Sequence, residues 1–90
     1  MLSMDDVYER MQYFARALGR FQDALAVSLA DLDRCHAAVD PLWRDAMRRE
    51  YDDRYGPLHD ALVRYVRVQG PGFQAFLGDK LRAIDQYLHG

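Results

Sequence analysis

Apolar residues recur at alternating steps of three and four along the first part of this chain, and the pattern does not slip between Met4 and Val39. Such spacing is typical of the seam of a coiled coil, and no proline interrupts it. It therefore predicts one helix over residues 4–39, on the order of 50 Å long at a rise of about 1.5 Å per residue. The two apolar rows consist of Met4, Met11, Leu18, Leu25, Leu32 and Val39, and of Val7, Phe14, Phe21, Ser28 and Cys35.

Residues that favour helix ends flank this segment. Ser3 and Asp6 have the spacing of a capping box, in which each side chain binds a free amide of the first turn. At the other end, Asp40-Pro41 has the form of an N-cap followed by a first helical residue, since proline at that position gives up no needed hydrogen bond. We therefore expect a tight corner at Val39–Trp43 and a second helix that starts at Pro41 and runs antiparallel to the first.

The rest of the chain predicts two further helical segments. One apolar stripe extends from Trp43 to Tyr65, which indicates a helix over residues 41–69 with a kink near Pro57. Gly70-Pro71-Gly72 is a strong helix breaker, so we expect a separate short helix over residues 73–88. The predicted fold is all-α and a single domain over residues 1–90: a long antiparallel helical hairpin with a kinked second helix and a short third helix.

Composition narrows the functional class. The chain has 90 residues, one cysteine and a formal net charge of -2, which excludes an internal disulfide and gives no electrostatic case for nucleic acid. No uninterrupted apolar stretch could span a bilayer, so we expect no membrane partner. The segment Met1–Asp6 is acidic and has no apolar run behind it, which does not fit a signal peptide. We expect a cytoplasmic protein, or one exported by a specialised machine without a cleavable signal.

Few residues have the spacing that catalysis or metal binding requires. Cys35 and His36 are adjacent, so on a helix they point about 100° apart and cannot pair as nucleophile and base. Asp33 and His36 have the i,i+3 spacing found in metal-binding bundles, and Asp40 follows nearby, but the apolar stripes carry no further carboxylate. We therefore expect no enzyme, no cofactor and no metal, and keep a small metal- or ligand-binding bundle as the alternative.

Five large side chains are the candidate binding residues, because aromatic and long aliphatic groups dominate interfaces between proteins. Trp43 at the corner could be a core anchor that closes the hairpin or a recognition residue. Tyr51 and Tyr55 lie one turn apart on the same side as Trp43, and fit core or dimer contacts better than base stacking, which needs a positive groove. The candidates are Phe21, Leu25, Trp43, Tyr51 and Tyr55.

The corner resembles that of the Trp-x-Gly helical-hairpin superfamily, the small substrates and partners of type VII secretion systems. The similarity lies in the length, the heptad-patterned first helix, the acidic start and Trp43 beside the corner, and it covers about residues 4–69. Here Trp43 is followed by Arg44-Asp45 in place of x-Gly, and the Tyr-x-x-x-Asp/Glu export signal is absent. The resemblance implies a helical pairing module, often dimeric, with no catalytic activity.

These observations favour a non-enzymatic interaction module that acts through an apolar helix face. The expected role is that of an adaptor or partner in a bacterial secretion or effector system; a neutralising partner of an effector would have the same kind of sequence. The expected partner is a second copy of the chain, as a homodimer, or a cognate helical protein. So few helices would bury only about 60% of their unfolded surface, which makes a lone chain marginal.

Overall fold

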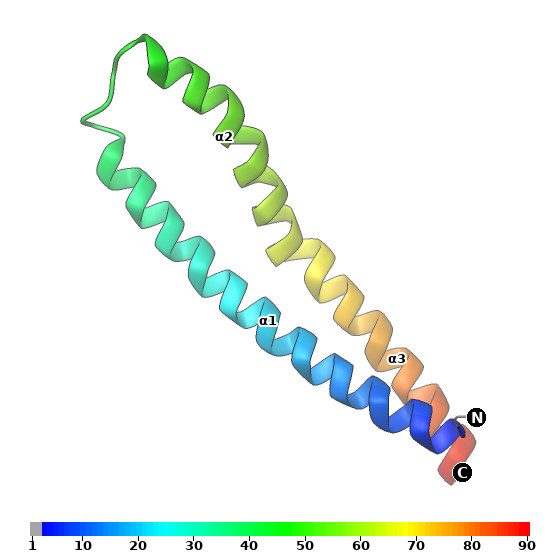
Figure 1. Cartoon of the computed structure of the whole chain (residues 1–90). Helices are drawn as coiled ribbons and strands as arrows, with labels where there is room; N and C mark the ends of the chain where they lie inside the picture. Colours follow the sequence, from blue (N-terminus) through cyan, green and yellow to red (C-terminus); the bar gives the residue numbers. More distant parts are fainter. Residues whose placement is uncertain (1–2) are drawn as a thin grey trace.

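The computed structural model describes residues 3–90, and these residues form helices and no strand. Helix α1 (Met4–Val39) forms one arm of a hairpin, and α2 (Ala46–Arg64), the π-helix η1 (Tyr65–Gln69) and α3 (Gly70–His89) together form the other. The hairpin measures 64 × 23 × 18 Å, with the chain ends together at one end and the corner at the other (Figure 1). The predicted all-α fold and its antiparallel hairpin are confirmed.

Helix α1 has the bounds that the heptad pattern predicts. Its capping box is formed, since the Ser3 hydroxyl accepts from the Asp6 amide and the Asp6 carboxylate accepts from the Ser3 amide, both at 3.2 Å. These two bonds satisfy amide groups that have no partner within the helix.

The second arm starts later than predicted. Asp40 ends α1 in a helical conformation, Pro41 lies in a turn, and α2 begins at Ala46 with Asp45 as its N-cap. The turn is closed by the amides of Leu42 and Trp43, which both donate to the Val39 carbonyl. The predicted start of the second helix at residue 41 is therefore wrong. Both Asp40 and Asp45 can cap a helix, and the contacts around Asp45 favour Asp45 as the N-cap.

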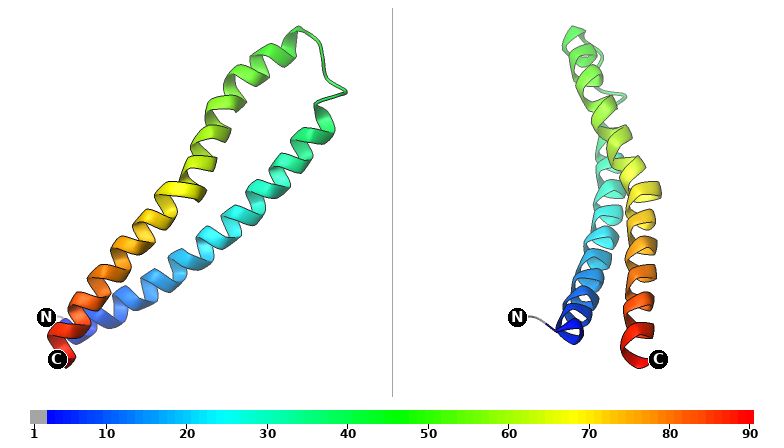
Figure 2. Two further views of the ribbon diagram at one scale, coloured as in Figure 1. Left: turned by 180° about the vertical axis from the view of Figure 1, so that it is seen from behind. Right: turned by 90° about the vertical axis from the view of Figure 1, so that its right-hand side faces the viewer.

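The predicted break at Gly70-Pro71-Gly72 is also wrong, because the helix continues through it. In η1 the Gly70 amide donates to the Tyr65 carbonyl, five residues back, so one extra residue is fitted into the turn before Pro71. Pro71 then lies in the first turn of α3, where it is tolerated. The segment predicted as a separate helix 73–88 therefore continues the second arm, which passes through Pro57 and changes direction near η1 (Figure 2).

The two arms meet along a narrow seam. Helix α1 lies against α3 and η1, whereas α1 and α2 are farther apart towards the corner (Figure 1). In the seam Gln22 Nε2 donates to the Gly70 carbonyl at 3.1 Å, and Gln74 Nε2 donates to the Ala15 carbonyl at 3.3 Å. Leu77, 6% exposed, is the only buried large apolar side chain among residues 3–90. A seam of this kind encloses almost no core.

Two glycines in α3 provide a matched test of the seam. A Cβ on Gly70 would lie 3.0 Å from both the Tyr65 carbonyl oxygen and Gln22 Nε2, whereas a Cβ on Gly72 would meet nothing within 4 Å. Gly70→Ala should therefore destabilise the protein despite the better helix propensity of alanine, and Gly72→Ala should stabilise it by about 1 kcal/mol. Urea unfolding of both variants measures this. Equal stabilisation by the two substitutions would mean that the arms do not approach at Gly70.

Candidate protein interface

The hairpin has two broad faces, one on each side of the seam. Successive residues of a helix point about 100° apart, so the residue before a seam residue lies on one broad face and the residue after it lies on the other. In an antiparallel pair, the preceding residues of both helices share the same face. On α1, Phe14 precedes Ala15 and Phe21 precedes Gln22; on α3, Phe73 precedes Gln74. The edge-on contact of the Phe21 and Tyr65 rings, with centroids 6.5 Å apart, links the two arms on this face.

All four phenylalanines of the chain lie on this face, which we call the Phe face. Each of them is between 46% and 55% exposed, although a phenylalanine side chain is normally among the most buried. Small residues lie between the rings on α1, where Ala17 and Ala24 alternate with the phenylalanines. The Phe face consists of Phe14, Ala17, Phe21, Ala24 and Ser28 on the first arm and Tyr65, Gln69, Phe73 and Phe76 on the second.

The opposite face, which we call the charged face, carries charged side chains among small ones such as Gly19, Ala26 and Ala30. The residues that follow seam residues include Arg16 and Asp23 on α1, and Asp60, Arg67 and Arg82 on the second arm. This asymmetry is typical of a helical pair that keeps one face in water and covers the other.

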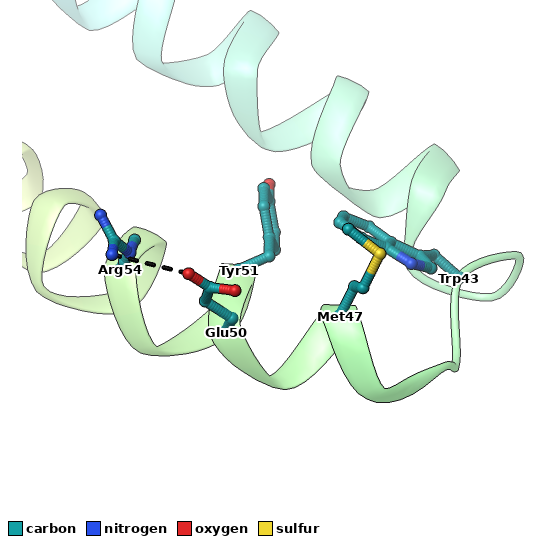
Figure 3. A pocket seen from close by; sticks show the side chains of 5 residues that line it. All are labelled: Trp43, Met47, Glu50, Tyr51 and Arg54. Atoms are coloured by element: carbon teal, nitrogen blue, oxygen red, sulfur yellow. Dashed lines mark ion pairs between the residues drawn. The ribbon is translucent and has the colours of Figure 1, made fainter.

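A second group of side chains holds the corner. Asp45 Oδ1 accepts hydrogen bonds from the Trp43 indole at 2.8 Å and from the Met47 and Arg48 amides at 3.0 and 3.3 Å. Trp43 and Tyr51 point from the corner and α2 towards α1, and with Met47 they line an open hollow of about 370 Å³ (Figure 3). Asp45 therefore joins the tryptophan to the start of α2, which explains why the helix begins there.

Arg48 connects the corner to both arms. Its Nη2 donates to Asp40 Oδ1 at 2.5 Å, its Nε donates to Asp52 Oδ1 at 2.8 Å, and its Nη1 donates to the carbonyls of Asp40 and Trp43. The guanidinium beside Asp40 holds the pKa of that carboxyl below its usual range. With its side chain only 14% exposed, Arg48 is the main polar contact of the corner.

Aromatic rings fill the space where α1 and α2 diverge. The rings of His36, Tyr51 and Tyr55 are nearly parallel, with His36 4.8 Å from Tyr55 and 5.7 Å from Tyr51 between centroids. His36 Nδ1 and the Tyr51 hydroxyl share a hydrogen bond of 3.0 Å. His59 stands next to Tyr55 and bonds to Asp33 at 2.7 Å. This stack sets the separation of the arms.

The hydroxyl of Tyr55 is buried in the stack and has no hydrogen-bond partner. Burial raises the pKa of this phenol above its ordinary value of 10.0, and the neighbouring Tyr51 and Asp33 add to the effect. An unpaired hydroxyl in such a place opposes folding.

The five candidate binding residues lie in three places. Phe21 is on the Phe face, and Leu25 is half-buried in the seam. Trp43, Tyr51 and Tyr55 are half-buried in the corner and its stack, where they contact their own chain. Phe14, Phe73 and Phe76 were not among the residues predicted to bind. The available signal in the sequence was that each immediately precedes a seam residue, namely Ala15, Gln74 and Leu77.

The residues considered for a metal site have separate partners. Asp33 bonds to His59, His36 bonds to Tyr51, and Asp40 bonds to Arg48. Within residues 3–90, no group of three or more histidine, cysteine or acidic side chains could hold a metal ion.

Comparisons of the chain with protein-family models, curated proteins and solved structures found no match. The resemblance to the Trp-x-Gly hairpins therefore stays a prediction. In the part of the chain that the structure describes, every helix is too short or too polar to cross a membrane.

Tyr51 and Tyr55 provide a matched pair of hydroxyl deletions. Tyr51→Phe removes the bond to His36 and should cost about 1 kcal/mol of stability. Tyr55→Phe removes an unpaired buried hydroxyl and should raise the melting temperature.

The pH dependence separates the two tyrosines further. Because the pKa of Tyr55 is raised in the folded state, the folded chain holds the phenol proton more tightly than the unfolded chain does. Stability therefore falls as the pH rises from about 10, the ordinary value, through the folded-state pKa. Tyr55→Phe should flatten the fall in melting temperature above pH 10, relative to the native chain and Tyr51→Phe. A lower melting temperature for Tyr55→Phe at neutral pH would contradict the buried, unpaired hydroxyl.

Proposed function

We propose that this protein is a non-enzymatic interaction module that binds a helical protein surface through its Phe face. The observation that supports this most is the placement of all four phenylalanines, about half exposed, on one face of a hairpin in which Leu77 is the one buried large apolar side chain among residues 3–90. Covering such a face removes apolar surface from water, which is the main favourable term in protein association. Helices fit it best, because the rows of rings and small residues run parallel to both arms.

The corner supports a passive role. Its charged and aromatic side chains bind one another: His36 bonds to Tyr51, Arg48 to Asp40 and His59 to Asp33. We therefore assign Trp43, Tyr51 and Tyr55 to setting the spacing of the two arms. The binding role is assigned to the four phenylalanines of the Phe face.

We further propose that the partner belongs to a bacterial secretion or effector system. This rests on the resemblance of the hairpin and Trp43 to the Trp-x-Gly proteins, in which helical pairing is the common feature. A cytoplasmic adaptor, a cargo protein exported without a cleavable signal and a neutralising partner of an effector would all use the same face, and differ only in what covers it.

Photo-crosslinking in cells that make the protein tests this proposal. A photoreactive phenylalanine at position 21 places the probe on the Phe face, and the same group at Tyr13, which is 68% exposed on the outer side of α1, is the matched aromatic control. We expect an adduct of defined mass at position 21, identified by mass spectrometry as this chain or a helical protein, and none at position 13. Absence of an adduct at position 21, or the same adducts at both positions, would overturn the proposal.

A further inference from the structure

The distribution of side chains on the Phe face indicates what covers it. We propose that the occupant is a second copy of this chain, packed Phe face to Phe face around a two-fold axis, with the corner of each copy over the chain ends of the other. This inference rests on the proposed function and identifies the partner. The result is an antiparallel four-helix bundle.

The α1 side of the face is complementary to itself when one copy is reversed. With the two-fold axis beside Phe21, Phe14 of one copy lies across from Ser28 of the other, and Ala17 lies across from Ala24. Phe14 thus meets a small residue, and the two Phe21 rings meet at the axis, where the small side chains of Ala17 and Ala24 leave room for close packing. A two-fold interface needs this self-complementarity, because the same patch serves both partners.

Charge follows the same register. Arg10 and Asp31 lie at the two ends of the row on α1 that contains Ala17 and Ala24. Each immediately precedes a seam-side residue, Met11 or Leu32. The antiparallel arrangement places Arg10 of each copy across from Asp31 of the other, which also pairs with Arg34 of its own chain, so Arg10 and Asp31 meet twice. In the parallel arrangement these residues would be at opposite ends of the bundle and could not pair.

The second arm fits the same axis. Tyr65 and Phe73 lie at equal distances along the chain from Gln69, so an axis beside Gln69 places Tyr65 of one copy across from Phe73 of the other. Phe73 and Phe76 already stack, with centroids 5.9 Å apart, and the Lys80 ammonium lies 5.4 Å from the Phe76 ring. Lys80 can therefore cover the ring with its aliphatic stem while its charge stays at the rim.

The area suffices for a stable dimer. The broad face is 64 by 23 Å, and the axis beside Phe21 lies near the middle of Met4–Val39, so two copies overlap over nearly their whole length. Face-to-face contact then buries on the order of 1,000 Å² per copy, compared with about 800 Å² per partner in a stable interface of standard size.

A spin label on the native Cys35, which is exposed and is the one cysteine of the chain, distinguishes the arrangements without any substitution. Cys35 lies 14 residues from Phe21 in α1, so the two labels of an antiparallel dimer should be roughly 45 Å apart at about 1.5 Å per residue. A parallel dimer would bring them within roughly 15 Å, the diagonal of a bundle whose helix axes are about 10 Å apart. Pulsed electron spin resonance on the purified chain should give the long distance, and the short one would overturn the proposal.

Charge reversal tests the register. Arg10→Asp and Asp31→Arg should each weaken the dimer about tenfold in sedimentation equilibrium, because two attractive pairs become repulsive. The double variant should return the dissociation constant to within a few-fold of the native value, since the reversed charges pair again. The matched controls are Arg16→Asp and Asp23→Arg on the charged face, which should change it little.

Other outcomes are equally decisive. A chain that stays cooperatively folded and monomeric at all concentrations would overturn the second copy as occupant, and face-specific crosslinking to another protein would then leave the proposed function standing. The inference would also be overturned if the charged-face controls dissociated the dimer and Arg10→Asp and Asp31→Arg did not. The contact would then lie on the charged face.

Discussion

Two helices side by side share one line of contact, and this constraint governs the rest of the structure. Along that line Leu77 is the one buried large apolar residue among residues 3–90, and two glutamine side chains and a glycine bring the arms together. Hydrophobic burial is the dominant favourable term in folding, and here all four phenylalanines stay about half exposed outside the seam. An elongated shape of 64 × 23 × 18 Å follows directly, since no third layer covers either face.

The two ends of the hairpin are held together by different kinds of contact. Near the corner, where the arms diverge, the contacts are mostly polar and aromatic and complete within the chain: Arg48 joins Asp40 to Asp52, and His36 lies against Tyr51 and Tyr55. Towards the chain ends α1 lies directly against η1 and α3, and the half-exposed phenylalanine rings stand beside this part of the seam. The corner fixes the separation and orientation of the arms, and this brings the rows that contain Phe21 and Phe73 to one face.

Much of this fold follows from local sequence, and the misses have definite physical causes. The period of three and four predicts α1 to the residue, because one helix needs only a consistent apolar stripe and good caps. The start of the second arm could not be predicted, because Asp40 and Asp45 are equally good caps and tertiary bonds of Trp43 and Arg48 favour the second. The sequence Gly70-Pro71-Gly72 is typical of a loop, and it gives no sign of the π-turn before Pro71 that lets the helix continue.

The heptad pattern also could not say which apolar row would face inward. Both rows of α1 fit a seam, yet the hairpin uses the row of Leu18 and Leu25 together with its flank at Ala15 and Leu29, and leaves Phe14 and Phe21 at the surface. The reason is geometric: one antiparallel arm can cover only a stripe on α1, and the glutamines and Gly70 bring that arm to the stripe with the smaller residues. In this chain the second arm covers fewer apolar rows than α1 offers, and this surplus is the basis for the proposed contact beyond the hairpin. The uncovered row contains Phe14, Phe21 and Ser28, and Ala17 and Ala24 lie beside it. This mixture of large and small side chains is what close packing against a second helical layer requires, and the proposed interface uses it in that way.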